Sequence, residues 1–388
     1  MLGRAHAATT GRTLVVVFLR GGCDGLNMLV PYGDSAYYKL RPNLGIAQPS
    51  AGNPLSALEL DGFFGFHPSM SALHGLYQQG WVAALPAVHY PSASLSHFEG
   101  QDIIENASTV PSTTGWLGRY LATLASADKK AFALSAGIPR SLMGPVPVSA
   151  YGDLRGLHLA ATKADQDLIA AILSSEYGNA PATSRPYDRG LRVAGQQLQV
   201  DIAELKDADA LPVTNSAVYP DTQFGRQMRQ AAALLKTRPA TELIALDLSG
   251  WDTHRWQGGS QPDGVHSLLL NQLSETIAAF YTDMGSAASS VLTLAMTEFG
   301  RTVAENSSGG TDHGNASTWL AVGPMVKGGV HSVAGWPGLA STQLDQGRYL
   351  AQSTDYRDIY GEILSHHLGV ASPSSLLTGY APKTVGFL

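Results

Sequence analysis

Short apolar runs alternate along this chain with longer stretches in which apolar residues recur at helical spacing. The runs are typical of buried strands, and they begin near residues 13, 81, 130, 242, 290 and 317. The helical stretches, several of which end on a glycine, cover 67–80, 164–178, 191–205, 224–237, 265–285 and 355–369. This alternation constrains the fold more than any other feature, because a strand followed by a long helix must return to the sheet.

Strands that alternate with helices of this length predict an α/β protein with a mostly parallel central sheet and helices on both faces. We expect residues 1–388 to form a single α/β domain, because chains of this class often exceed the usual length of about 150 residues per domain. Residues 159–205 are predicted to form a helical cap or insertion within it. Residues 26–65, rich in Pro, Gly and Ser, are predicted to form a long surface loop.

The composition excludes several classes of protein. A formal net charge of -6, a pI near 6.0 and no cluster of Lys and Arg argue against a nucleic-acid-binding surface. The longest apolar runs are too short to span a bilayer, so we expect no membrane span. The single cysteine, Cys23, rules out an intrachain disulfide framework. A hydrophobic content of 44% predicts a globular chain with a sizeable core.

Three carboxylates follow or end predicted strands. Asp24 comes just after the first run, Asp247 ends the run that begins at 242, and Glu298 follows the run that begins at 290. In open parallel sheets, ligands bind at the carboxyl ends of the strands, so we expect a binding site at one rim of the sheet. Asp24 has an ordinary alternative role, since an Asp at this point could equally cap the helix that follows.

The segment "SSGGTDHG" places Asp312 and His313 in a loop rich in glycine and serine. A carboxylate oxygen and an imidazole nitrogen suit zinc, manganese or a similar divalent metal. Gly309, Gly310 and Gly314 would permit the close backbone approach and positive φ angles that such a turn needs. Taken alone, an Asp-His pair is a weak signal and is better explained as a surface turn.

The segment "DLSGWDTH" holds three candidate ligands, Asp247, Asp252 and His254. Asp252 and His254 are two residues apart and would point the same way from an extended chain. In the ordinary alternative, Asp247 caps the following turn and His254 faces solvent. Because three candidate ligands crowd one strand end, we favour a metal site here.

The segment "SLSHFEG" supplies hydroxyl groups and a histidine. Ser96 and Glu99 match the S-x-x-E capping box, which predicts a helix that starts after Ser96. A serine at this place could act as a nucleophile toward an anionic group, although most such serines only cap the helix. His97 could bind a metal or a substrate, or merely start the helix.

Three more side chains could support the site. Glu298 and Arg301, in "TEFGRT", could orient metal ligands or an anionic substrate, and a simple surface ion pair explains them equally well. His67, in "GFHPSM", lies in a loop-like segment and could complete the site.

Segments spread over residues 14 to 370 resemble a bacterial family catalogued as a domain of unknown function, DUF1501. The matching segments are "FLRGGCDGLN", "FHPSM", "SHFEGQD", "GWLGRYL", "GWDTH", "TEFGRT", "SGGTDHG" and "DYRDIY". That family is similar to the alkaline phosphatase and sulfatase superfamily, whose hydrolases use one or two divalent metals and a metal-activated nucleophile. The resemblance implies the fold of that superfamily and export to the periplasm or beyond, typically by a twin-arginine signal, which this sequence lacks.

The resemblance also implies roles for individual residues. Asp24 would be the metal ligand after the first strand, and Asp312 with His313 would complete one metal site. The middle segment would hold a second metal, and Ser96 falls where the superfamily keeps its nucleophile at a helix start. The chain departs from the superfamily spacing D-x-x-x-H, because Trp251 lies four residues after Asp247. It also lacks the C-x-P-x-R signature, so we do not expect a formylglycine-type sulfatase.

The sequence therefore predicts a hydrolase of phosphate or sulfate esters, or of a related anionic ester carried by a small molecule or a polymer, that depends on Zn, Mn or Ca. Two other classes stay open. The first is a non-catalytic binding or assembly protein of the exported bacterial envelope that keeps the sheet and a structural metal. The second is a metal-dependent oxidoreductase, although no glycine fingerprint for a dinucleotide follows a predicted strand.

Overall fold

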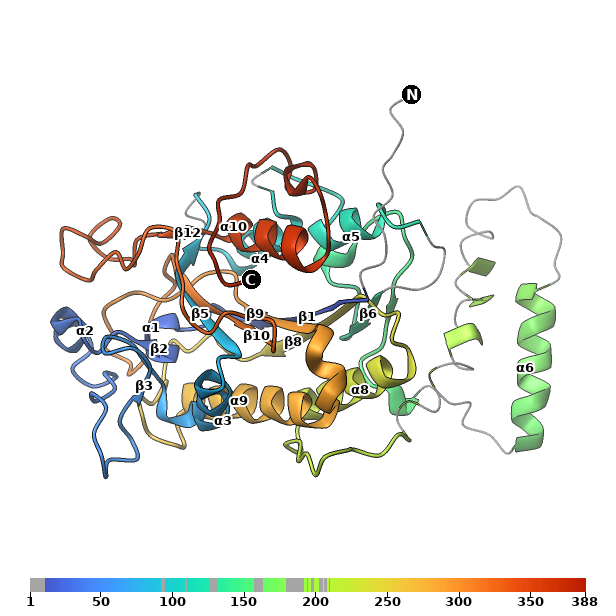
Figure 1. The fold of residues 1–388 in the computed structure, drawn as a ribbon, viewed down its shortest axis with the longest axis horizontal. Coiled ribbons are helices and arrows are strands. Elements are labelled where there is room, and N and C mark those ends of the chain that lie inside the picture. The colour runs from blue at the N-terminus through green and yellow to red at the C-terminus, as the bar shows by residue number, and fades with distance from the viewer. Residues whose placement is uncertain are drawn as a thin grey trace.

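The computed structural model describes residues 11–91, 95–108, 110–125, 131–156, 163–178 and 211–388, with single residues or short groups between 192 and 210. A nine-stranded sheet runs through its centre in the order β11-β5-β10-β9-β1-β8-β6-β7, with β12 beside β5 (Figure 1). The strands are β1 Thr13–Arg20, β5 Val82–His89, β6 Ala131–Leu134, β7 Ser149–Ala150, β8 Leu243–Ser249, β9 Val291–Met296, β10 Ser317–Val322, β11 Gly329–Val330 and β12 Thr354–Asp355.

Most neighbouring strands of this sheet are parallel. β1 pairs in parallel with β8 and β9, and β6 continues the parallel order beyond β8. β10 is antiparallel to both of its neighbours, β9 and β5. β1 lies in the middle, and its residues are buried up to the half-buried Arg20. A strand covered on both faces has no solvent side, which is why its sequence is a continuous apolar run.

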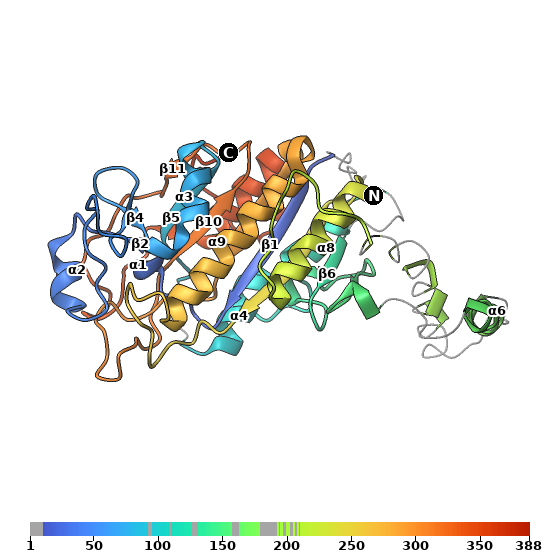
Figure 2. The same ribbon diagram turned by 90° about the horizontal axis from the view of Figure 1, so that it is seen from below.

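Helices cover both faces of the sheet, as predicted (Figures 1 and 2). One face carries α4 His97–Asn106, α5 Trp116–Leu121 and α10 Tyr356–Glu362, and the other carries α3 Ser71–Gln78, α8 Gln223–Thr237 and α9 Val265–Met284. Alternate residues of β1 serve the two layers, since Val15 and Val17 belong to one hydrophobic cluster, while Leu14 and Val16 belong to the other. The predicted α/β class is confirmed.

The predicted helical insertion contains α6 Lys163–Gly178, which lies outside the two helical layers in both ribbon views (Figures 1 and 2). Its described side chains are exposed or half-buried, and Leu168 and Ile172 are among the exposed ones. Much of 159–205 lies outside the described residues. Every helix of the described part of the chain is too short or too polar to cross a bilayer.

The prediction of a long surface loop over residues 26–65 is wrong. This segment holds the short helices α1 Gly25–Met28 and α2 Ser35–Leu40 and a three-stranded sheet of β2 Leu29–Val30, β3 Leu58–Glu59 and β4 Gly65–Phe66. Tyr37 and Ile46 are fully buried and build a third hydrophobic cluster. Elements this short contain too few apolar residues to show a periodic pattern. The high Pro and Gly content of the segment therefore led to the prediction of a loop.

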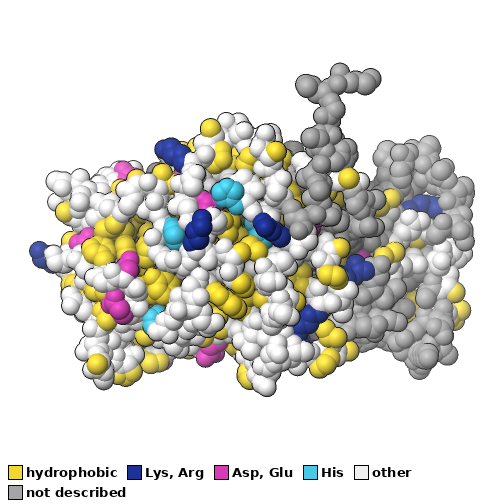
Figure 3. All heavy atoms as spheres, in the orientation of Figure 1, with side chains coloured by type: hydrophobic (Ala, Val, Ile, Leu, Met, Phe, Trp, Pro, Cys, Tyr) yellow, Lys and Arg dark blue, Asp and Glu magenta, His cyan; other side chains and the backbone are white. Residues whose placement is uncertain are grey.

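Charged side chains are sparse on the surface. On the face shown in Figure 3, Lys and Arg side chains appear as separate spots among polar and apolar atoms, and the acidic side chains are equally scattered. The described atoms of this face therefore form no extended basic surface of the kind that nucleic-acid binding requires.

The sheet topology brings distant segments to one edge. Because β1, β5, β8 and β9 are parallel, the chain leaves all four at the same edge of the sheet. β10 runs in the opposite direction, so the chain enters β10 at that edge. The segments around residues 21–24, 95–97, 250–254, 297–301 and 312–316 therefore lie next to one another.

Two of these segments are in direct backbone contact through glycines. The Gly300 amide donates to Asn315 O at 2.7 Å, and the Gly314 amide donates to Gly300 O at 2.9 Å. A Cβ atom at Gly314 would lie 2.3 Å from the carbonyl carbon of Arg301, and one at Gly300 would lie 2.1 Å from Ala316 O. Only residues without a side chain allow the loop after β9 and the loop before β10 to lie this close.

Gly314→Ala should therefore lower the free energy of unfolding by roughly 1–3 kcal/mol, because the backbone must move to accept the methyl group. Chemical denaturation measures this change. Gly75→Ala is the matched control, since a Cβ at Gly75 of α3 meets open space and alanine is the better helix former. Equal stability of the Gly314→Ala variant and the wild type would contradict the close contact between the two loops.

Candidate metal centre

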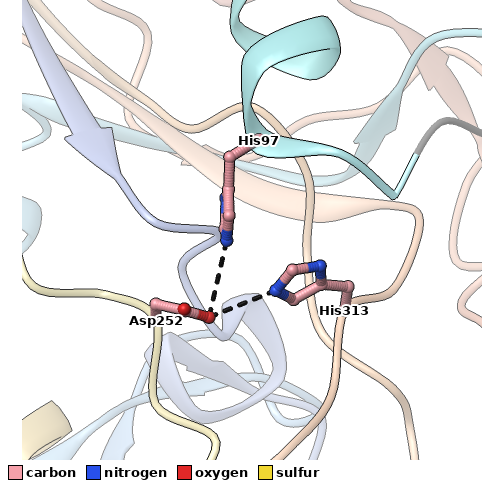
Figure 4. A group of neighbouring side chains, drawn as sticks. All are labelled: His97, Asp252 and His313. Carbon is pink, nitrogen blue, oxygen red and sulfur yellow. Dashed lines mark hydrogen bonds and ion pairs between the residues drawn. The ribbon is translucent and has the colours of Figure 1, made fainter.

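Three side chains from separate loops meet at the edge of the sheet where β1, β5, β8 and β9 end (Figure 4). His97 is the first residue of α4, Asp252 follows β8, and His313 precedes β10. Asp252 Oδ1 lies 3.5 Å from His97 Nε2 and 3.2 Å from His313 Nε2. Both imidazole rings point toward the carboxylate in Figure 4.

A third histidine joins this group. His254 Nε2 lies 3.0 Å from Asp252 Oδ1 and 3.0 Å from His313 Nε2. We call His97, Asp252, His254 and His313 the histidine cluster. In tetrahedral zinc sites with bonds of about 2.0–2.1 Å, neighbouring ligand atoms lie roughly 3.3 Å apart. Four of the six distances between these ligand atoms are 3.0 to 3.5 Å, which matches that spacing. The ligand atoms of His97, Asp252 and His313 all lie within 4.8 Å of one another.

The other ring nitrogen of each histidine faces a hydrogen-bond acceptor. These contacts join His97 Nδ1 to Glu298 Oε1 at 2.9 Å, His254 Nδ1 to Asp312 Oδ1 at 3.0 Å, and His313 Nδ1 to Leu95 O at 2.7 Å. A backbone carbonyl can only accept, so Nδ1 of His313 carries the proton. With a metal ion on the Nε2 side, Glu298 and Asp312 would accept a proton from Nδ1 of His97 and His254 in the same way. The Nε2 lone pairs are then left facing the interior of the cluster.

Lone pairs that face one another and a carboxylate repel unless a cation lies between them. His97 Nε2 is a buried atom without a hydrogen-bond partner, although it points at the cluster. Histidine ligands whose second nitrogen donates to a carboxylate or a carbonyl are the usual construction of protein metal sites. The residues present therefore fit a divalent metal, with His97, Asp252 and His313 as its ligands and His254 as a fourth candidate beside them.

The charge of Asp252 is held in place by a buried cation. Burial by itself would raise the pKa of Asp252, but the Arg301 guanidinium and His254 outweigh it and lower the pKa to about 2. Arg301 Nη2 lies 2.7 Å from Asp252 Oδ1. The Asp252 side chain is also 49% exposed, so the cluster opens to solvent, as a catalytic site must and a closed structural metal site need not.

Arg301 also fastens the surrounding loops. Its side chain is fully buried, and it donates to Gly22 O at 2.6 Å, to Trp251 O at 2.9 Å and to Thr311 O at 3.2 Å. It contacts Gly21 O as well. One guanidinium thus connects the loops after β1, β8 and β9 with the loop before β10, which fixes the positions of the ligands that those loops carry.

Glu298 holds His97 from the opposite side. Burial would raise the pKa of Glu298, but hydrogen bonds from His97, Gln101 and Gly21 outweigh it and lower the pKa. Gly21 N and Gln101 Nε2 lie 2.9 and 3.1 Å from Glu298 Oε1. The hydrogen bond to Glu298 raises the pKa of His97, whereas burial lowers the pKa of His313.

The structure gathers the predicted ligands at one centre instead of two. The sequence predicts Asp252 and His254 at one metal, and Asp312 and His313 at another. In the structure, Asp252, His254 and His313 face one another. Asp312 lies outside the group of facing side chains, behind the His254 ring. Its Oδ1 contacts His254 Nδ1 and accepts from Asn306 Nδ2 at 3.2 Å. Asp312 therefore contacts the cluster through the outer nitrogen of His254.

Asp24 does not join the cluster, contrary to prediction. It is 1% exposed, and its two carboxylate oxygens lie 2.6 and 2.9 Å from the Nη atoms of Arg41, which is equally buried. Burial would raise the pKa of Asp24, but Arg41 outweighs it and lowers the pKa. The charge that a metal would have balanced is already balanced by a guanidinium.

Asp247 and His67 are also placed elsewhere. Asp247 Oδ1 lies 2.7 Å from Arg20 Nε, on the face of the sheet that α4 covers, and burial raises the pKa of Asp247. His67 is fully buried and caps a 3₁₀ turn, since its Nδ1 accepts from Ser69 N at 3.1 Å while its Nε2 contacts Gly259 O at 2.9 Å. Neither residue contacts the histidine cluster.

Ser96 is the N-cap residue of α4, as predicted, and it is exposed. Its side chain does not make the expected capping hydrogen bond to the helix. Its two neighbours in sequence both take part in the cluster, because Leu95 O accepts from His313 and His97 contacts Asp252. Ser96 therefore lies at the rim of the centre.

Sequence reasoning missed several supporting residues. Arg41, Asn306 and the Leu95 carbonyl act only through partners that the fold brings near. Asn306 offered a local signal, since an Asn before "SSGG" is typical of a turn in which the side chain binds nearby amides. Arg41 offered none, because nothing in "KLRPN" shows that its guanidinium turns inward to Asp24.

Comparisons with known proteins identify a family but no activity. The profile of the family described as "Protein of unknown function (DUF1501)" matches residues 11–372. A comparison with curated protein sequences finds no match.

Solved structures with a similar arrangement of elements include a phosphonate monoester hydrolase, a periplasmic domain in complex with Zn and an alkaline phosphatase. They include the phosphonate monoester hydrolase SpPMH from Silicibacter pomeroyi, with 11% identity, coverage of 96% of this chain and 77% of that chain, and a TM-score of 0.40. The C-terminal periplasmic domain of EcEptC from Escherichia coli, in complex with Zn, shows 10% identity, coverage of 82% and 76%, and a TM-score of 0.37. The alkaline phosphatase from the Antarctic bacterium TAB5 shows 9% identity, coverage of 91% and 98%, and a TM-score of 0.37. Likeness at this level says nothing about the chemistry of this chain.

Glu298→Gln should weaken zinc binding by roughly 10–100-fold, because a ligating histidine loses the carboxylate that orients it. Titration calorimetry with the metal-stripped protein measures the change. Glu275→Gln, at an exposed position of α9, is the matched control and should leave the affinity unaltered. Zinc affinity that is the same in all three proteins would show that Glu298 does not support a metal ligand.

Arg41→Met should lower the free energy of unfolding by roughly 3–5 kcal/mol, because the buried Asp24 carboxylate loses its counter-charge. The double variant Asp24→Asn/Arg41→Met should recover part of this loss, and Asp24→Asn alone should still bind zinc. Denaturation curves and metal content measure the two effects. Loss of zinc from a folded Asp24→Asn protein would restore Asp24 to the ligand set and refute its assignment as a purely structural partner of Arg41.

Proposed function

We propose that this chain, which belongs to the family described as protein of unknown function (DUF1501), is a metal-dependent hydrolase of phosphate or sulfate esters. The family description names no activity, so the proposal rests on the histidine cluster. One observation carries it: the Asp252 carboxylate oxygen lies 3.0 to 3.5 Å from the Nε2 atoms of three histidines, in a group that is open to solvent.

The donor set favours zinc among the divalent metals predicted from the sequence. Nitrogen-rich sites of low coordination number suit zinc, and manganese is a weaker alternative. Calcium takes six to eight oxygen ligands, which this cluster does not offer. A bound zinc ion would act as a Lewis acid toward an anionic ester and would lower the pKa of a hydroxyl group next to it.

Ser96 is the candidate nucleophile. Its hydroxyl lies at the N-terminus of α4, where backbone N–H groups and the helix dipole favour an anionic group. In the proposed reaction, Ser96 Oγ forms a bond to phosphorus or sulfur while the bond to the ester oxygen breaks. The departing alcohol takes the proton that the hydroxyl loses. Water then cleaves the bond to Ser96 and releases the inorganic anion.

Other residues orient these groups. Glu298 and Asp312 hold the rings of His97 and His254, and Arg301 keeps Asp252 ionised. Arg348 Nη2 lies 3.4 Å from Asp312 Oδ2 and is more than half exposed, so a cation is available near the cluster for an anionic substrate. Export to the periplasm or beyond, expected from the family resemblance, stays a prediction.

The function is tested by metal analysis of the purified chain followed by a hydrolysis screen. The substrates are aryl phosphate, aryl phosphodiester and aryl sulfate, each assayed with the zinc-loaded, manganese-loaded and metal-stripped protein. We expect bound zinc and turnover of at least one ester. Bound zinc without turnover of any ester would favour the non-catalytic binding or assembly protein, and turnover that is unaffected by metal removal would refute the proposal.

Ser96→Ala should lower kcat on the order of 10³-fold or more, since loss of a nucleophile removes the step that the other residues support. The zinc content of the variant should not change. Ser71→Ala is the matched control, because Ser71 is an exposed serine at the start of α3. Full activity of Ser96→Ala with zinc still bound would exclude Ser96 as the nucleophile and leave water in that role.

A further inference from the structure

Two residues directly after His254 project away from the protein. The segment "HRWQ" is anchored at both ends, because His254 belongs to the histidine cluster and Gln257 is fully buried. Gln257 donates its backbone amide to Gly309 O at 2.9 Å, and its side-chain oxygen accepts from Thr311 Oγ1 at 2.7 Å. Arg255 and Trp256, between these anchors, are both exposed.

Trp256 is unusual in two independent respects. Its side chain is 81% exposed, whereas each of the five other tryptophans is buried or half-buried. Its φ angle is +55°, in the left-handed region that bulky residues rarely adopt. A strained backbone that turns a large aromatic ring toward solvent has no role in packing, and such strain is typical of functional positions.

The ring borders a hollow of about 650 Å³. Around it lie the Asn43 amide, the hydroxyl groups of Ser307 and Ser308, and the Arg255 guanidinium, with Leu44 as the further apolar side chain. The lining therefore holds one cation and no carboxylate. The Asn43 Nδ2 already donates to Glu305 Oε1 at 2.5 Å, which leaves its side-chain oxygen to accept from a ligand. An apolar ligand would leave the Arg255 guanidinium and the serine hydroxyl groups without partners, whereas a ligand with one apolar face and a hydroxylated edge would satisfy both kinds of surface.

Asn306 connects the hollow to the metal centre. Its Nδ2 donates to His254 O at 3.0 Å and to Asp312 Oδ1 at 3.2 Å. Its Oδ1 accepts from Ser308 N at 2.9 Å and from Gly310 N at 3.1 Å. The loop that lines the hollow and two residues at the histidine cluster, His254 and Asp312, are thus held by the same amide, which links the hollow to the cluster.

We propose that this hollow is a saccharide subsite, in which a sugar ring stacks on Trp256 and its hydroxyl groups meet Asn43, Ser307 and Ser308. This inference rests on the proposed function in one respect, because it makes the substrate of that site an anionic ester of a saccharide. The C–H face of a sugar ring suits an aromatic surface, and the hydroxyl groups at its edge suit amides and hydroxyls. Arg255 adds a preference for a phosphorylated or sulfated sugar.

Direct binding can be measured without turnover. The difference between the emission of the wild type and of Trp256→Phe isolates the fluorescence of Trp256, the exposed tryptophan. Acrylamide quenches it, and a bound sugar ring shields it. The probes are glucose 6-phosphate and glucose 6-sulfate, with ethyl phosphate as the anion without a sugar and phenyl phosphate as the apolar ring. We expect both sugar esters to protect Trp256, and ethyl phosphate to give no protection.

The outcomes separate the two proposals. Protection by the sugar esters in a protein that hydrolyses no ester would support the subsite and refute the hydrolase. Turnover of aryl esters without protection by either sugar ester would overturn the subsite and leave the hydrolase intact. Protection by phenyl phosphate equal to that by glucose 6-phosphate would show a general apolar contact and would also overturn the saccharide assignment.

A kinetic comparison gives a second readout if sugar esters are hydrolysed. Trp256→Ala should raise KM for glucose 6-phosphate up to about tenfold, the size expected for the loss of one stacked ring, with kcat retained. The KM for ethyl phosphate should not change. Val218→Ala, which removes another exposed apolar side chain, is the control and should leave both values unchanged. Equal effects of Trp256→Ala on the two substrates would contradict the subsite.

Discussion

The buried guanidinium of Arg301 is the contact on which the rest of the candidate site depends. Four loops end at one edge of the sheet, and loops are the least constrained parts of an α/β fold. Arg301 binds the backbone carbonyls of Gly22, Trp251 and Thr311 and the carboxylate of Asp252. Because a guanidinium is planar and permanently charged, it fixes both the geometry and the ionisation of this edge. Asp252, His254 and His313 lie on loops that Arg301 connects, while Glu298 holds His97 against them.

Buried and half-buried arginines pair with the carboxylates near this edge, and this pairing determines which carboxylate is left to bind a metal ion. Asp24 is balanced by Arg41 in a fully buried pair, and Asp247 is balanced by Arg20. Asp252 is different, because its oxygen faces Arg301 on one side and histidine nitrogens on the other. Three histidines and one carboxylate of this kind make a single nitrogen-rich centre, whereas the sequence suggests two oxygen-rich ones. The difference matters chemically, since it favours zinc over calcium.

Much of the fold and part of the site could be predicted from the sequence. Continuous apolar runs and helical spacing located β1, β8, β9 and α9, and the strand-end rule then placed Glu298 at the edge where the histidine cluster lies. The rule failed for Asp247, because a residue inside a strand faces one layer of helices instead of the edge. It failed for Asp24, because the pairing with Arg41 depends on how the segment after β1 folds back. Long-range partners of this kind leave no local pattern in the chain.

The histidine cluster also organises its surroundings, since the backbone that carries His254 continues directly into the exposed Trp256. Our central claim is that His97, His254 and His313 bind one metal ion together with Asp252. Zinc K-edge X-ray absorption of the zinc-loaded protein tests it most directly. We predict a single zinc environment with three imidazole ligands, which falls to two in His254→Ala. A spectrum with one imidazole or none, or one that is identical in wild type and His254→Ala, would contradict the claim.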